Sequence, residues 1–470
     1  MVLYVGLILS AAFSLIGLIN WRQGIFCMIL LAAVQDPIRK LAPGAPAYLI
    51  LITTPILIAA LVKGSGSVPG WWQDFKRFCP RVSQSYSIFA LFCLPAAYIS
   101  FTYGPGTWMV TLLGIASYSV VLFSIVAGFH FSRSGLELRR VVAFYVLAHG
   151  LMLSGSLIQF FDLADWRIVG DEALGFQWAR YAPGYVVHFI SGFYRSGDVM
   201  GWHAAAVCCL AMTLAVPGRE RFRWLWIGIA VLALFALLVC GRRKMVYVLP
   251  IFISCFVVLY WLAGRGGRRM RLLAIVAITI GVGFFFAQFL GSETTFIRYY
   301  TDQSHSILQS VEKRGFDTVA TTIRQAGFFG YGLGFATPGA HHLNVPKPHI
   351  WQEAGTSRLF AELGIPGAVA FIVLMLQILR RLWDVTQGEL KAGSAYGIYC
   401  AGLLSFFVSN LCSLTVSGQI LADPFILSWL GFLVGLLMGV VRLPDDPRED
   451  RYALAQAQIW DNRLYESPRT

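Results

Sequence analysis

The chain has 470 residues, of which 57% are hydrophobic and only 13% are charged, and its mean hydropathy is +0.66. This composition excludes an ordinary soluble globular protein, because long apolar runs with hardly a charge recur along the sequence and are typical of membrane-spanning helices. The formal charge of +13 lies largely in short loops between these runs, and no basic helix or nucleic-acid-binding module is recognisable. We therefore expect no nucleic-acid partner.

In chain order, the apolar runs predict an all-α polytopic membrane protein with about 12–14 transmembrane helices. The first run lacks a basic start and a small-residue cleavage site, so we interpret it as a retained span and not as a signal peptide. The second run is short and fits either a span or a re-entrant segment. The predicted spans lie near residues 2–20, 22–35, 46–63, 86–103, 107–129, 140–160, 199–216, 223–240, 245–263, 272–290, 359–380, 396–416 and 421–441.

Loop charge predicts the side of the membrane on which each loop lies. Lys and Arg are abundant in alternate loops, and the positive-inside rule places those loops in the cytoplasm. The two long loops, at about residues 161–198 and 291–358, are then extracytoplasmic, and we expect the second to contain short helices. A single transmembrane domain is expected over residues 1–442, followed by a cytoplasmic C-terminal tail at 443–470.

Cysteine and histidine patterns favour neither a disulfide framework nor a metal site. Nearly all of the nine cysteines lie in or beside apolar runs, and none forms a C-x-x-C motif. The spacing of His341, His342 and His349 fits no standard set of metal ligands. We therefore predict no metal and no cofactor.

Cations gather on the predicted outer side, where the positive-inside bias disfavours them. Arg242, Arg243 and Lys244 occupy one tight turn between two spans, and Arg195 precedes another span. Arginine presents a planar fork that suits phosphate oxygens, and lysine adds a point charge. These cations therefore suggest an anionic ligand from the membrane, such as a lipid phosphate or pyrophosphate.

The alternative for the outer cations is structural. Interfacial Arg and Lys often contact ordinary headgroups or pair with nearby carboxylates, which here are Asp36 and Asp198. We favour this interpretation for Arg39 and Lys40. We favour the ligand for the triplet at 242–244, because three adjacent cations in one short outer turn are otherwise hard to place.

The large outer loop contains a predicted amphipathic helix within residues 312–329. Arg314 and Arg324 are ten residues apart, close to three helical turns, so they fall on nearly the same face. The glycine-rich segment 330–339 follows, with the pattern G-x-G-x-G. Because it does not sit in a strand–turn–helix unit, we interpret its glycines as tight turns that let the backbone approach the membrane or a substrate.

Four stretches resemble, in their order, the bacterial O-antigen ligases and O-antigen and exopolysaccharide polymerases, which are GT-C-type membrane glycosyltransferases. The stretches are RSGDVMGWHAAA, CGRRKMVYVLP, RGFDTVATTIRQAGFFGYGLGFATPG and EAGTSRLFAELGIPG. The resemblance covers residues 190–440, and the N-terminal third shares only the hydropathy pattern. Where the ligases begin the last block with a histidine implicated in catalysis, this chain has Glu353, as some polymerase-like members do. This difference favours a polymerase.

The resemblance implies an enzyme that joins undecaprenyl-pyrophosphate-linked glycan repeat units at the periplasmic face of the bacterial inner membrane. The implied reaction is a metal-independent, inverting glycosyl transfer, and chain-length regulator and flippase proteins are the implied partners. Glu353 is the expected catalytic carboxylate, with His349 as the fallback, and Glu362 is expected to pair with an arginine or fix a helix start. The expected substrate-binding residues are Arg195, Arg242, Arg243, Arg314, Arg324, Arg358 and His349.

Other functions stay open at this point. One is an O-antigen ligase, another is a transporter or flippase for a lipid-linked glycan or another anion, and a third is a non-catalytic assembly subunit. A transporter would place ionisable groups near the midplane, and His149 is the main such group. Four aromatic residues either stack on sugars or belong to the interfacial aromatic belt: Tyr194, Trp202, Tyr331 and Trp351.

Overall fold

The structure is a computed structural model. It describes residues 2–443 except 68–69, 132–133, 176, 183, 217–221, 263–295, 297–298, 301–316, 338–339, 341–342, 344, 346–353 and 395. Every predicted span except the one near 272–290 coincides with a described helix. That run and the tail beyond residue 443 lie outside the described residues.

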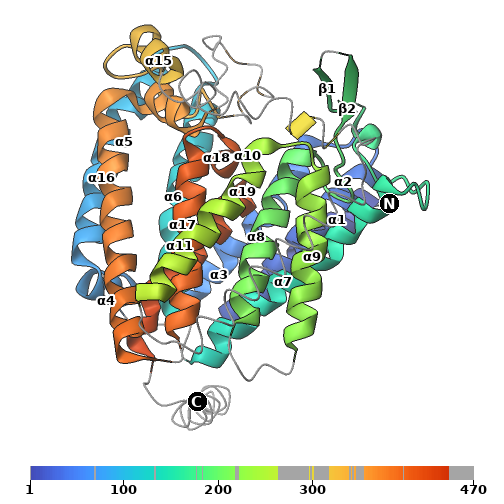
Figure 1. The fold of residues 1–470 in the computed structure, drawn as a ribbon. Helices are drawn as coiled ribbons and strands as arrows, with labels where there is room; N and C mark the ends of the chain where they lie inside the picture. Colours follow the sequence, from blue (N-terminus) through green and yellow to red (C-terminus); the bar gives the residue numbers. More distant parts are fainter. Residues whose placement is uncertain are drawn as a thin grey trace, which may run out of the picture.

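The described residues form a bundle of long helices (Figure 1). Among them, ten helical segments are long and apolar enough to cross a membrane, and α9 is a shorter apolar helix. This confirms the all-α polytopic membrane class. The helices of the first half are α1 (Val2–Ile19), α2 (Trp21–Leu41), η1 (Ala47–Leu51), α3 (Thr54–Ser67), α4 (Trp71–Phe78), α5 (Pro80–Phe101), α6 (Trp108–Phe131) and α7 (Gly135–Phe160). Those that follow are η2 (Glu172–Leu174), α8 (Gly197–Ala215), α9 (Arg223–Val239), α10 (Arg243–Val246), α11 (Val248–Leu262), α15 (Thr318–Ala326), α16 (Gly355–Ala392), α17 (Gly397–Leu414), α18 (Gln419–Ala422), α19 (Pro424–Gly439) and η6 (Val440–Arg442).

Helix α2 corresponds to the short second run of the sequence. It is 21 residues long, which at 1.5 Å per residue gives about 30 Å, but it is not among the ten described helices that are apolar enough to cross a membrane. The Asn20 side chain caps its start by accepting from the backbone N–H groups of Arg22 and Gln23. Arg39 and Lys40 lie in its last turn, so the helix carries charge to one end of the bundle.

Loops gather at two opposite ends of the bundle (Figure 1). We call one the hairpin end, because it carries the short antiparallel strands β1 (Ala179–Ala182) and β2 (Tyr185–His188), and the other the α4 end. The described parts of residues 161–198 and 291–358 lie at the hairpin end, where α15, α10 and α18 are also found. The sequence predicts a loop over residues 161–198, and these two strands within it were not expected.

The centre of the bundle is formed by α8 and α19. Their apolar windows are 94% and 89% buried inside the protein, whereas that of α1 is only 17% buried. Helix α19 packs closely on α6 because Gly431, Gly435 and Gly439 recur every fourth residue; a Cβ at Gly435 would lie 1.9 Å from the carbonyl oxygen of Ile125. Such small-residue faces are a common means of helix association in membranes.

Helix α16 is broken at Gly364, whose φ of 64° and ψ of −167° are not helical. The backbone N–H of Ile365 donates to the Phe328 carbonyl, and the N–H of Tyr331 donates to the Ala361 carbonyl. The break separates a short helical piece at the hairpin end from the longer apolar piece. It also fixes the glycine-rich segment beside that short piece, where charged side chains collect.

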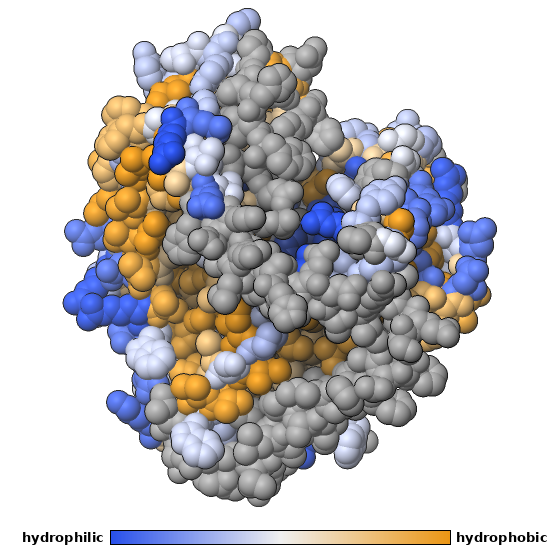
Figure 2. Space-filling model, turned by 45° about the horizontal axis from the view of Figure 1, so that its top comes forward, coloured by the Kyte–Doolittle hydropathy of each residue, from blue (hydrophilic) through white to orange (hydrophobic). Residues whose placement is uncertain are grey.

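The surface agrees with this arrangement. With the hairpin end turned forward, strongly hydrophilic residues lie inside a recess near the centre of the view, and hydrophobic residues cover much of the left side (Figure 2). Exposed apolar side chains on α1 include Tyr4, Ile8 and Leu15. Apolar surface of this extent is expected where lipid replaces water as the solvent.

Candidate functional site

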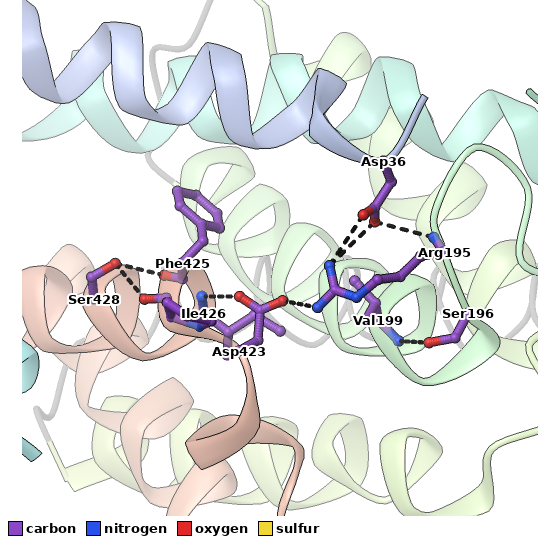
Figure 3. A network of polar contacts seen from close by, with 9 residues as sticks. Asp36, Arg195, Ser196, Val199, Asp423, Phe425, Ile426 and Ser428 are labelled. Atoms are coloured by element: carbon purple, nitrogen blue, oxygen red, sulfur yellow. Dashed lines mark hydrogen bonds and ion pairs between the residues drawn. The ribbon is translucent and has the colours of Figure 1, made fainter. Parts of the chain in front are cut away.

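A buried ion-pair triad lies at the hairpin end (Figure 3). The Arg195 Nη1 group donates to Asp36 at 3.1 Å, and its backbone N–H donates to the same carboxylate at 3.1 Å. Its Nη2 group donates to Asp423. All three residues are buried, and two carboxylates around one guanidinium compensate the charge that burial would otherwise leave uncompensated. The guanidinium is therefore engaged with protein carboxylates on both Nη groups.

Local sequence places each member of the triad at a helix end. Ser196 follows Arg195 and caps α8 by accepting from the Val199 N–H at 3.3 Å. Asp423 caps α19, since its Oδ1 atom accepts from the Ile426 N–H at 2.9 Å and Pro424 begins the helix. The triad thus joins the last turns of α2 to the first turns of α8 and α19.

Lys40, one turn beyond Asp36, is also buried. Its ammonium donates to the carbonyls of Ile168 and Gly192, at 3.1 and 2.9 Å. Arg39 donates to the Ala45 carbonyl at 3.1 Å. These two cations hold backbone at the hairpin end, which is consistent with the structural role favoured for them from the sequence.

A column of imidazole and phenol rings continues from the triad into the bundle. The His149 and His203 rings are stacked, with centroids 4.1 Å apart. Tyr145 Oη lies 2.9 Å from His203 Nδ1, and Tyr194 Oη lies 3.1 Å from His149 Nδ1. All four residues are buried, and His149 Nε2 has no hydrogen-bond partner among the described residues. Tyr194 directly precedes Arg195, so triad and column are covalently continuous.

A more accessible cation cluster lies beside the triad. Arg242 and Lys244 both contact the Asp198 carboxylate, at 2.8 and 3.0 Å, and these side chains are 17–27% exposed. The Arg242 guanidinium also lies over the rings of Trp178 and Phe189, with its carbon 5.3 and 4.6 Å from the two centroids. Two cations share this one carboxylate, so the cluster keeps positive charge that favours an anion.

Arg243 belongs to the same turn. Its guanidinium carbon lies 4.9 Å from the centroid of the Tyr299 ring. Arg242 precedes helix α10 as its N-cap residue, and Gly241 before it has a φ of 70°. A Cβ at Gly241 would lie 2.1 Å from the Phe189 ring, so glycine is required for the turn to sit this close.

A second buried network surrounds Arg358 and Glu362, which form an i,i+4 ion pair at 3.3 Å. Arg358 Nη2 donates to the Thr337 hydroxyl at 2.6 Å, and Nη1 donates to the Leu421 carbonyl at 2.7 Å. The Thr337 and Tyr118 hydroxyls donate to the Glu362 carboxylate at 2.9 and 2.8 Å. The pairing of Glu362 with an arginine, expected from the sequence, is confirmed.

The turn at residues 421–423 links the two buried networks. The carbonyl of Leu421 accepts from Arg358, and two residues later the carboxylate of Asp423 accepts from Arg195. This turn between α18 and α19 therefore connects α16 to α8 through two hydrogen bonds, and Arg195 extends the connection to Asp36 in α2.

The glycine-rich segment packs against two helices of the bundle. A Cβ at Gly332 would lie 2.8 Å from the backbone nitrogen of Ser100, and one at Gly334 would lie 2.1 Å from the carbonyl oxygen of Val110. Both glycines have positive φ, of 106° and 91°. Their backbone approaches helices α5 and α6 closely, and this packing requires residues without a side chain.

The structure brings together only some of the predicted site residues. Arg195 and Arg242 are in neighbouring clusters, Arg358 lies in the second network, and Arg324 is exposed in the last turn of α15. The part of the predicted helix that is described runs from Thr318 to Ala326. Three of the expected site residues lie outside the described residues: Arg314, His349 and Glu353. The same holds for His341, His342 and Trp351, which the sequence analysis also considered.

Two of the proposed sugar-stacking aromatics are unsuited to that role. Trp202 and Tyr194 are 1% and 2% exposed, and the Trp202 indole N–H donates to Asn410 at 2.9 Å. Both therefore belong to the packed interior, where no saccharide reaches their rings. Tyr331 is half-buried in the glycine-rich segment.

Two residues of the site, Asp423 and Trp178, were not among those predicted from the sequence. Asp423 lies inside a predicted span, and an acidic residue in such a run is a signal that it has a partner or a function. Trp178 was passed over because its position in a loop carried no motif. Only the fold of residues 161–198 brings it over Arg242.

An apolar cavity of about 70 Å³ lies deeper, between α5, α6, α16, α17 and α19. Phe89, Phe371, Leu374 and Leu430 are among its lining residues, and Tyr118 reaches it from the second network. Its apolar lining suits neither a glycan nor a phosphate. The accessible cation cluster is therefore the better candidate for a polar ligand.

No protein-family model matches this chain, and no curated protein matches it. The fold alone defines the class, which is that of polytopic α-helical membrane proteins with a charged network at one end of the bundle.

Proposed function

We propose that this protein is a membrane glycosyltransferase that polymerises undecaprenyl-pyrophosphate-linked glycan repeat units. The observation that carries the proposal is the accessible cluster of Arg242 and Lys244 at the end of the bundle where a lipid phosphate would lie, with Arg242 over two aromatic rings. The order of the sequence motifs that resemble O-antigen ligases and polymerases supports the same assignment. The glutamate at position 353 favours the polymerase within that superfamily.

Charge distribution supports an outward, periplasmic orientation of the hairpin end in a bacterial inner membrane. Among the described residues, basic side chains outnumber acidic ones at the α4 end, whereas the two are nearly balanced at the hairpin end. The positive-inside rule then assigns the α4 end to the cytoplasm. The basic residues near helix ends on that side include Arg22, Lys63, Lys76, Arg77, Arg81, Arg139, Arg140, Arg223, Lys391 and Arg442.

The proposed reaction is a single displacement that uses Glu353, Arg242 and Lys244. An acceptor hydroxyl attacks the anomeric carbon, the bond from that carbon to the pyrophosphate oxygen breaks, and the hydroxyl proton passes to Glu353. Arg242 and Lys244 stabilise the charge that grows on the leaving pyrophosphate, which removes the need for a metal. Arg195 holds the start of α8 beside them, because its own guanidinium is engaged by Asp36 and Asp423.

Purified protein in lipid nanodiscs, supplied with a lipid-linked glycan, tests this function. A ladder of products is expected for a polymerase and a single transfer for a ligase. Arg242→Ala should reduce the rate by about 10²- to 10³-fold, the usual effect of removing one preorganised donor. Arg167→Ala is the control, since Arg167 is an exposed arginine of the same end of the bundle. Equal rates in the two variants would refute the proposed role of the cluster.

A transporter is the second candidate, and the buried column of His149 and His203 is the observation that favours it. Ionisable groups inside the bundle are typical of proton- or ion-coupled transport. Movement of a fluorescent lipid-linked glycan across vesicles containing the protein, without any polymer, would favour this alternative. We rank it second because His149 and His203 are stacked and hydrogen-bonded to tyrosines, which is typical of packed side chains.

A further inference from the structure

We propose that Trp178 is a sugar-stacking residue that binds the saccharide attached to the phosphate held by Arg242. The inference rests on the proposed function, since it assigns the second half of a glycosyl phosphate ligand. It names a residue that carries no motif in the sequence.

The position of Trp178 is the first argument. The Arg242 guanidinium lies over its ring, with the carbon 5.3 Å from the centroid, yet 43% of the Trp178 surface remains exposed. Phe189 carries the same guanidinium but is only 2% exposed. Of these two rings, Trp178 alone is accessible to a ligand that reaches Arg242.

The Trp178 backbone is also held in place on both sides. Its N–H donates to the Asp171 carboxylate at 3.1 Å, and its carbonyl accepts from the Phe189 N–H at 2.9 Å. The first bond ties it to a buried residue next to η2, and the second extends the β1–β2 hairpin by one rung. A preorganised backbone lowers the entropy lost when a ligand binds.

Arg242 and Trp178 together match the two parts of a glycosyl phosphate. In a glycosyl phosphate the phosphate and the sugar are directly bonded, so their binding groups must be neighbours, as Arg242 and Trp178 are. The guanidinium recognises phosphate oxygens through a planar fork, and the indole ring offers a large apolar face with a polar edge to a sugar ring. An anion without a sugar would use Arg242 but gain nothing from Trp178.

This difference defines the experiment. Dissociation constants of inorganic phosphate and of N-acetylglucosamine 1-phosphate are measured on the full chain in nanodiscs. In the unaltered protein the sugar phosphate should bind about fivefold to tenfold more tightly than phosphate. Trp178→Ala should bring this ratio close to one while phosphate affinity is retained, and Trp178→Tyr should keep most of the ratio. Trp166→Ala is the control, because Trp166 is an exposed tryptophan of the same outer segment.

The outcomes separate the two proposals. If Arg242→Ala weakens both ligands and Trp178→Ala leaves the ratio unchanged, the anion site stands and the stacking role of Trp178 is wrong. A lower ratio in Trp166→Ala to the same extent as in Trp178→Ala would also overturn it. If the unaltered protein binds neither ligand, the anion site of the proposed function fails, and this inference fails with it.

Discussion

Arg195 and Asp36 are joined through both backbone and side chain, although 159 residues separate them in the sequence. The N–H and the Nη1 group of the arginine donate to the same carboxylate, and Nη2 reaches Asp423 on the other side. This geometry fixes the start of α8 against the end of α2. It makes Arg195 a positioning residue for the cation cluster that begins at Asp198.

The first prediction concerns that triad. Arg195→Met removes the charge but keeps most of the volume, and it leaves two buried carboxylates without a cation. Breaking a buried pair typically costs about 3–5 kcal/mol, so the thermal midpoint in detergent and the yield of monodisperse protein should fall sharply. Arg167→Met, at an exposed position of the same end, should change neither.

A triple variant distinguishes a structural from a catalytic role for Arg195. Arg195→Met combined with Asp36→Asn and Asp423→Asn removes all three charges, and the asparagine oxygens still accept the backbone N–H groups of residue 195 and Ile426. We expect it to be more stable than the single variant. If Arg195→Met folds normally but makes no polymer, the positioning role is contradicted and Arg195 acts in the reaction itself.

The second prediction tests the packing of the glycine-rich segment. Gly334→Ala should destabilise the protein by several kcal/mol or prevent folding, because the backbone has a φ of 91° and the new Cβ would meet the Val110 carbonyl oxygen. Gly388→Ala is the control: a Cβ there meets nothing within 4 Å inside α16, so it should raise stability by about 0.5–1 kcal/mol. Thermal unfolding in detergent measures both, and similar midpoints would contradict the packing role.

The third prediction concerns how stability depends on the protonation of Asp171, whose carboxylate accepts from the Trp178 N–H. Burial raises the pKa of the Asp171 carboxyl above its ordinary value of 3.8, while the Trp178 N–H and Lys40 partly oppose the shift. A raised acid pKa means that the folded state holds the proton more tightly than the unfolded state. The contribution to stability is therefore present below pH 3.8 and is lost as the pH rises through the raised pKa.

Asp171→Asn keeps an acceptor for the Trp178 N–H and removes the titration. Its thermal midpoint should exceed that of the unaltered protein at pH 7, and the difference should shrink when both are measured near pH 4. Asp165→Asn, at an exposed position in the same segment of the chain, should show no such dependence. A loss of stability at pH 7 would mean that Lys40 makes the charged carboxylate favourable overall.

The fourth prediction follows from the sequence and concerns Glu353. Glu353→Gln keeps size and hydrogen bonding but removes basicity, so polymer formation should fall by about 10²- to 10⁴-fold while lipid-linked donor still binds. An active Gln variant beside an inactive Ala variant would mean that the residue only orients the acceptor. Activity in both, with His349→Ala inactive, would move the catalytic role to His349.

The sequence by itself determined the membrane class and the positions of most helices in the described part of the chain. Apolar runs long enough to cross a bilayer have few alternatives, because backbone polar groups in lipid must be satisfied within a helix. It also indicated the pairing of Glu362 with an arginine, since Arg358 lies one turn away in the same helix. Local spacing is sufficient for such features.

Contacts between distant segments were decided only by the tertiary structure. Asp423 and Asp36 approach Arg195 because α2, α8 and α19 meet at one end, and no local pattern encodes which helix ends become neighbours. Trp178 lies on Arg242 only because a short hairpin folds back over the α9–α10 turn. A buried charge is stabilised only when an opposite charge lies beside it. The sequence therefore indicates that such a residue needs a partner, but the packing of the helices decides which residue that partner is.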